Sequence, residues 1–185
     1  MEIQLEHHFK NTCYSVDKLL DGVQNLNTFL NRLDKQCQEH PSMWDPDKYK
    51  GDGFECLLEG IIKLNPTNTR INITDYSPSA VDEMGIDGSG KTFDNTAHEV
   101  QAKCSMNSQK YITETKENIA MFPAMALSKH PGKKIKMTLF TTAKDLTPQL
   151  ENFNNSVRTL GRKDIEKLVN TPTFWKLFKQ LLEDK

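Results

Sequence analysis

The chain has 185 residues, of which 36% are hydrophobic and 26% charged, and its formal net charge is −1. These values fit one soluble domain, and no apolar run approaches the length that a membrane-spanning helix needs. The near-zero net charge excludes a global basic field, so any contact with nucleic acid has to come from a local patch.

The four cysteines are scattered, and none belongs to a C-x-x-C pair. This spacing argues against a zinc site and against a framework of disulfide bonds. Free thiols favour a reducing, cytoplasmic location. The polar N-terminus does not resemble a signal peptide, and we expect no membrane partner.

Residues 15–39 are expected to form one long amphipathic helix. Their apolar residues follow spacings of three and four, which is typical of a helix with a single apolar stripe: Val16, Leu19, Val23, Leu26, Leu30, Leu33 and Cys37. The stripe is expected to pack on the body of the protein, and a homodimer formed through this helix is the alternative. Because prolines follow at 41 and 46, we predict an N-terminal helical appendage over residues 1–50 and the main domain over 51–185.

A second helix is predicted over residues 54–64. Its apolar stripe includes Phe54, Leu57 and Ile61, and Asn65-Pro66 ends it. Glu55 lies beside this stripe, so it is either a solvated acid or a side chain that points into a site.

The stretch from Gly85 to Thr92, GIDGSGKT, has two interpretations. It matches the phosphate-binding P-loop pattern G-x-x-x-x-G-K-[ST]. A P-loop requires a buried strand before it and a helix after it. The preceding residues, SPSAVDEM, are polar, and the following FDNT is a cluster of turn formers. The flanks therefore make nucleotide binding, or a kinase activity, the weaker interpretation.

The stronger interpretation is a pair of strands joined by a glycine-rich hairpin at residues 88–90. Asp87 ends the first strand, and Gln101 and Lys103 lie on the second, over residues 97–104. Alternation there puts Val100 and Ala102 on one face and Gln101 and Lys103 on the other. We interpret this as a half-buried strand that presents a polar site.

The remaining elements complete an α/β pattern. Residues 70–76 are expected to form an edge or second strand, and 105–129 a long helix. Further elements are a strand over 135–142, a helix over 145–153, a strand over 157–160, and helices over 161–169 and 172–182. The predicted fold class is α/β, with a mixed sheet flanked by helices.

Three motifs together resemble the Mrr-like branch of the PD-(D/E)xK restriction-endonuclease superfamily. Gly53-Phe54-Glu55 resembles its G-x-x-F-E helix start, Asp82 to Asp87 its D-x-x-G-[IV]-D strand, and Val100 to Lys103 its V-Q-x-K strand, with glutamine in place of the usual glutamate. The resemblance spans residues 51–169. It implies a restriction-endonuclease-like core and a magnesium-dependent deoxyribonuclease, either alone or as the nuclease domain of a larger restriction or helicase protein.

The resemblance also implies a site. Asp87, Gln101, Glu55 and the carbonyl of Ala102 would hold Mg²⁺, for which Mn²⁺ would substitute, because hard cations prefer oxygen ligands. Lys103 would act beside them in catalysis, and Glu99 is a further candidate on the same strand face. DNA is the expected partner, and the lysines expected to contact its phosphates are Lys91, Lys110, Lys133 and Lys134. A non-catalytic domain that binds DNA or protein is the other alternative.

Overall fold

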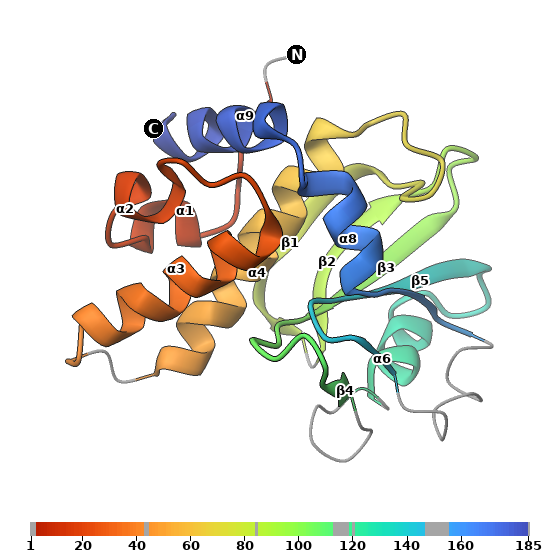
Figure 1. The fold of residues 1–185 in the computed structure, drawn as a ribbon. Helices are drawn as coiled ribbons and strands as arrows, with labels where there is room; N and C mark the ends of the chain where they lie inside the picture. Colours follow the sequence, from red (N-terminus) through yellow and green to blue (C-terminus); the bar gives the residue numbers. More distant parts are fainter. Residues whose placement is uncertain are drawn as a thin grey trace.

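The computed structural model describes residues 3–42, 45–83, 85–112, 119, 121–146 and 156–184. A five-stranded sheet in the order β1-β2-β3-β5-β7 lies at its centre (Figure 1). The strands are β1 (Thr74–Glu83), β2 (Ile86–Lys91), β3 (Ala97–Lys103), β5 (Ile135–Thr141) and β7 (Arg158–Leu160). The first two pairings are antiparallel, whereas β3, β5 and β7 run parallel. The predicted mixed sheet flanked by helices is confirmed.

The sheet is covered on both faces, as the alternation of its strands requires. Val100 and Ala102 of β3 belong to the larger buried cluster, together with residues of the helices α3 (Leu26–Glu39), α4 (Pro46–Leu64) and α9 (Pro172–Glu183). Met137 and Leu139 of β5 belong to the smaller cluster, under α6 (Met121–Lys129). Figure 1 shows these helices on either side of the strands.

The long helix expected over residues 15–39 is wrong as a continuous element. The chain forms α1 (Phe9–Thr12), α2 (Val16–Leu20) and α3 (Leu26–Glu39). Gly22, with φ of +69°, lies in the break between α2 and α3, and Asn25 then caps α3 by accepting the Thr28 amide hydrogen. The sequence periodicity was insensitive to this break because the apolar spacing continues across it.

The apolar stripe itself is buried inside the chain. Leu19, Leu26, Leu30 and Leu33 are at most 1% exposed, and they share one cluster with Phe54 and Phe178. The packing interpretation is therefore the one that holds, and the stripe offers no seam for a second copy. The described part of residues 1–50 does not pack as a separate body, because its buried residues share one core cluster with Val100 and Ala102 of the sheet.

Helix α4 (Pro46–Leu64) starts eight residues before the predicted helix. Asp45 caps it and Pro46 occupies its first turn, so the proline begins the helix instead of breaking it. Two glycines then allow close helix packing. A Cβ at Gly53 would lie 2.7 Å from the Leu33 side chain, and one at Gly60 would lie 2.6 Å from Phe178.

The second half of the chain departs from the prediction in two places. Within residues 105–129, only Met121–Lys129 is helical among the residues described, and Tyr111–Ile112 forms the short strand β4. Asp145–Leu146 is a strand, β6, paired with β4, and the rest of the expected helix over 145–153 lies outside the described residues. The predicted C-terminal helices are confirmed as α8 (Arg162–Val169) and α9 (Pro172–Glu183). No described helix is long and apolar enough to cross a membrane.

Candidate functional site

The residues that match the P-loop pattern do not form a loop that leads into a helix. Gly85 is a turn residue with φ of +90°, and Ile86 to Lys91 form β2, an inner strand between β1 and β3. The glycine-rich bend expected at residues 88–90 is also wrong, because these residues pair with β3. Gly88 is required there by packing: a Cβ at this position would lie 2.2 Å from the Tyr76 hydroxyl.

Asp87 lies near the start of β2, where the pairing with β3 stops. The pairing continues from Lys91 only as far as Gly88, opposite Val100. One step beyond, the Asp87 carboxylate accepts a hydrogen bond from the Ala102 amide, with Oδ2 2.6 Å from the nitrogen. A side chain thus replaces a strand partner, and this fixes the carboxylate at the end of β3.

Glu55, Asp87 and Lys103 line one cavity of about 570 Å³. The first comes from α4, the second from β2 and the third from the last residue of β3. Glu55 and Lys103 also line an adjoining cavity of about 490 Å³, together with Ala102 and Lys110. Three of the four predicted catalytic side chains therefore meet at the carboxyl end of β3.

Gln101 is the one predicted catalytic residue whose side chain does not line either cavity. It is fully buried, and its amide Oε1 and Nε2 have no hydrogen-bond partner. A Cβ on Gly85 would lie 2.7 Å from Nε2, so the amide lies against the tip of the β1–β2 hairpin. A buried amide without partners is costly, about 1–3 kcal/mol per group, which marks Gln101 as a position that packing alone does not explain.

Two residues beside Glu55 were not predicted from the sequence. His7 is buried, and its Nε2 lies 3.2 Å from a Glu55 carboxylate oxygen. Asp52, one helical turn before Glu55, contacts Lys48 at 3.0 Å and His8 at 2.9 Å. No spacing pattern connects residue 7 to residue 55, but the acids at 52 and 55 share a helix face and were a usable signal.

His7, Asp52 and Glu55 offer donor atoms within 4.8 Å of one another, which is close enough to hold a cation. The hydrogen bonds argue for a different role of the histidine. The Phe9 amide donates to His7 Nδ1 at 3.2 Å. Nδ1 is then an acceptor, so Nε2 carries the hydrogen and donates it to Glu55. In this tautomer His7 orients Glu55, and Nε2 has no lone pair left for a metal.

Glu59, one turn after Glu55, has a structural role. Its side chain is fully buried and accepts hydrogen bonds from the amides of Glu6 at 2.7 Å and His7 at 2.9 Å. Lys63 balances the charge, with Nζ 2.7 Å from the carboxylate. Glu59 therefore fixes the N-terminal segment that carries His7.

The four lysines predicted to bind DNA lie at opposite ends of the strands of the sheet. Lys110 lines the adjoining cavity beside Lys103. Lys91 ends β2 opposite Ala97, roughly 13 Å along the strand from Asp87, and pairs with Asp75 at 3.7 Å. Lys133 and Lys134 precede β5 and are exposed at that same end of the strands, near the start of β3. Only Lys110 is thus positioned next to the other candidate residues.

Glu99, the further candidate on β3, is enclosed on the α6 face of the sheet. It is 1% exposed, accepts a hydrogen bond from Ser89 at 2.6 Å and lies 2.6 Å from His130 Nε2. Lys129 lies 3.6 Å away. This carboxylate holds α6 against the sheet and lines neither of the two cavities.

Cys104 lines the adjoining cavity, but it is not a reactive thiol. Burial raises its pKa from 9.0 to about 11, so the thiol remains protonated at neutral pH. Burial also raises the pKa of Tyr76, and the negative charge of Asp87 adds to this effect, followed by Glu55. The site thus offers carboxylates and a lysine, not a cysteine nucleophile.

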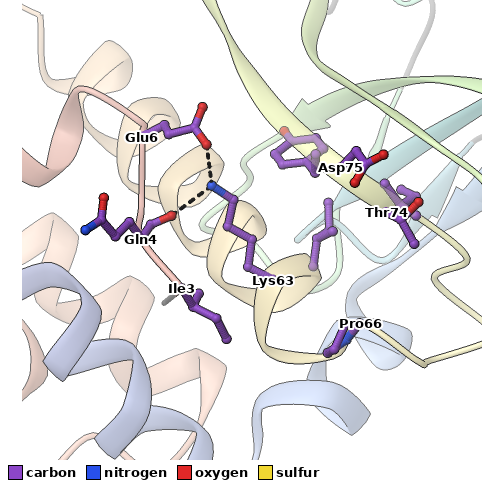
Figure 2. Close-up of a pocket in the computed structure, with 10 residues that line it drawn as sticks. Ile3, Gln4, Glu6, Lys63, Pro66, Thr74 and Asp75 are labelled. Atoms are coloured by element: carbon purple, nitrogen blue, oxygen red, sulfur yellow. Dashed lines mark hydrogen bonds and ion pairs between the residues drawn. The ribbon is translucent and has the colours of Figure 1, made fainter. Parts of the chain in front are cut away.

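A third cavity, of about 580 Å³, lies between the N-terminal segment, the end of α4 and β1. Figure 2 shows that Lys63 is engaged there by Glu6 and by the Gln4 carbonyl. Ile3, Ile62 and Ile73 make much of its lining apolar. None of the residues predicted from the sequence lines it. Of its charged groups, Glu6 and Lys63 pair with each other, and Asp75 pairs with Lys91.

Comparisons with known proteins give little further information. No family model matches the chain, and no curated protein matches it. Among solved structures, the fold is similar to protein VC1899 from Vibrio cholerae, with a TM-score of 0.49 and 14% sequence identity. The match covers 95% of this chain and 50% of the Vibrio cholerae chain, so this chain spans about half the length of that protein. We draw no functional argument from this similarity.

Proposed function

We propose that this protein is a magnesium-dependent deoxyribonuclease. The observation that carries the proposal is that Glu55, Asp87 and Lys103 line one cavity although they come from separate elements. Two carboxylates and a lysine are the groups that phosphodiester hydrolysis needs beside a divalent cation. The motif resemblance to the PD-(D/E)xK nucleases supports the same chemistry.

The donor set fits a hard cation. Asp87 and Glu55 would hold Mg²⁺ through carboxylate oxygens, with the carbonyl of Ala102 as a third oxygen donor. Gln101, also predicted as a ligand, is not counted among these donors, because its side chain is buried and lines neither cavity. When bound, the ion would neutralise charge on the phosphate and activate water for attack.

The remaining steps belong to the residues of the chain. The Lys103 ammonium would approach a phosphate oxygen and stabilise the negative charge that builds up there during attack. Its main chain is held in place, because the Lys103 carbonyl accepts hydrogen bonds from Thr141 Oγ1 at 2.8 Å and from the Thr142 amide at 3.2 Å. His7 would keep the Glu55 carboxylate turned toward the cavity.

The alternatives have less support. Nucleotide binding by residues 85–92 would need a loop followed by a helix, and these residues form a strand. A binding domain that works through residues 15–39 would need an exposed apolar stripe, and that stripe is buried. We therefore expect ATP to bind no better than to a generic basic surface.

The test is metal-dependent nicking of supercoiled plasmid DNA. Wild-type protein should nick with Mg²⁺ or Mn²⁺ and not with EDTA. Lys103→Ala should lower the rate by about 10²-fold or more, a typical cost of losing a group that acts in the transition state. Lys91→Ala is the matched control, because it removes a lysine from the opposite end of the strands. Equal rates for wild type and Lys103→Ala, with both proteins folded, would refute the proposal.

A further inference from the structure

The carboxyl ends of the three parallel strands β3, β5 and β7 lie side by side, since Lys103 lies opposite Thr141 and Phe140 lies opposite Leu160. Each strand is followed by a segment that carries an exposed lysine. Lys110 follows β3, Lys144 follows β5 and Lys163 follows β7 in the first turn of α8. The strand order therefore arranges these lysines in one row that begins at Lys103.

Hydrogen bonds join the three segments into one fixed rim. Thr142 Oγ1 accepts from the Ser105 amide at 2.6 Å and lies 2.8 Å from the Ser105 carbonyl oxygen. The Lys144 amide donates to the Lys110 carbonyl at 2.8 Å, and the Arg162 amide donates to the Ala143 carbonyl at 3.2 Å. The backbones that carry the lysines are therefore fixed relative to one another before any ligand arrives.

Cavities follow the row from end to end. The adjoining cavity is lined by Lys103, Lys110 and the residues from Cys104 to Asn107. The next cavity, of about 410 Å³, starts at Ser108 and contains Lys144 and Lys163. The rim is therefore hollowed along the same line as the lysines.

Three of the lysines on this line keep charges that the described residues do not neutralise. Lys103, Lys144 and Lys163 make no ion pair with any residue in the described part of the chain, and Lys144 lies 5.0 Å from the centre of the Tyr111 ring. The acid in the last cavity, Glu166, is engaged by Arg162 at 3.2 Å. The first cavity also contains Asp47 and Glu55, but basic residues outnumber acids over the two cavities, on a protein whose total charge is −1.

We propose that Lys110, Lys144 and Lys163 bind the phosphate backbone of duplex DNA and lead it to Lys103. This inference rests on the proposed function for the identity of the ligand. Several cations on a fixed rim suit a polyanion, and such contacts position a duplex without reading its sequence. Lys91, Lys133 and Lys134 lie at the opposite end of the strands and do not belong to this row of lysines.

The test compares two triple variants of the full chain. In one, Lys110, Lys144 and Lys163 are changed to Gln; in the other, Lys91, Lys133 and Lys134 are changed to Gln. Binding of a labelled short duplex DNA is measured by fluorescence anisotropy in EDTA over a range of KCl concentrations. Three lost phosphate contacts should reduce the slope of log K against log salt by about 2.7 for the first variant only, at about 0.9 per contact. Melting temperatures should not change, because all six side chains lie on the surface.

Three outcomes would overturn the inference: no DNA binding by the wild type, equal weakening by both variants, or an unchanged slope in the first variant. If the same lysines bind single-stranded RNA more tightly than duplex DNA, the ligand is RNA, and this result also contradicts the inference. Because no metal is present, the result is separate from cleavage. If the protein binds DNA through these lysines but never cleaves it, the proposed function is wrong and the inference about the lysines still holds.

Discussion

The two ends of strand β3 contain similar residue types in opposite situations. At the amino end, His98 lies 2.8 Å from Thr138 Oγ1, and Arg158 donates to the same hydroxyl at 3.0 Å. Arg158 also donates to the carbonyls of Arg70 and Ile71, both at 2.6 Å. At the carboxyl end, Lys103 and Glu55 line cavities. The polar groups at the amino end bind one another, whereas Glu55 and Lys103 at the carboxyl end also line a cavity.

The largest effect that would sharpen this comparison is expected at Asp87. Asp87→Asn removes the charge but keeps an oxygen for the Ala102 amide, so the melting temperature should stay unchanged. Cleavage should fall more than about a hundredfold, because even the hydrogen-bond partners of metal ligands cost 10–100-fold when they are lost.

Asp87→Ala separates the two roles of this side chain. It leaves the Ala102 amide without its acceptor, which should cost about 1–3 kcal/mol in calorimetry. If Asp87→Asn cleaves at the wild-type rate, the carboxyl end of β3 is as structural as the amino end, and the comparison fails.

At the amino end we expect a dependence of stability on pH. Burial lowers the pKa of His98 from 6.5 to about 4, and the positive charge of Arg158 adds to this shift. Below pH 6.5 the unfolded chain binds a proton that the folded chain does not, so stability is complete above 6.5 and is lost as the pH falls toward 4. The loss should reach about 3 kcal/mol, at 1.36 kcal/mol per pKa unit.

Urea unfolding of wild type and His98→Gln at pH 7.5 and pH 4.5 measures this loss. The variant has no imidazole to titrate, so its stability should fall less between the two pH values. Parallel losses in the two proteins would show that His98 is not the group responsible. Cleavage activity at neutral pH should be the same in both, because His98 lies far from the cavity along β3.

The smallest effect is expected at His7. His7→Phe fills the same buried volume but cannot donate to Glu55, so Mn²⁺ affinity in calorimetric titration should fall about tenfold. His7→Gln retains a donor and an acceptor and should restore most of that affinity. If both variants lose affinity in proportion to their melting temperatures, His7 only supports the fold.

The sequence was sufficient for those parts that depend on local periodicity. The alternation in β3, the stripe of α9 and the burial of Leu26 to Leu33 all follow from residues a few positions apart. The break at Gly22 was missed because an apolar spacing that continues across a gap looks the same as a continuous helix. The predicted bend at residues 88–90 lies inside strand β2, because glycines usually mark turns, whereas Gly88 is required here by the Tyr76 ring.

The site was predictable only where its residues lie on the motif strands and helix. Glu55, Asp87 and Lys103 could be named in advance, and the structure brings all three to one cavity. His7 could not be named, because its contact with Glu55 joins residues 48 positions apart and needs Glu59 to hold the N-terminal segment. Lys144 and Lys163 could not be named either, since their alignment with Lys103 depends on the order of the parallel strands.

The anchoring of the N-terminal segment by Glu59 has a consequence for the order of assembly. The contact between His7 and Glu59 spans 52 residues, and closing so long a loop has an entropic cost that is recovered only after α4 exists to receive it. We therefore expect the segment that carries His7 to dock only after α4 has formed. One wall of the cavity contains His7, so the cavity takes its final shape only when this late step is complete.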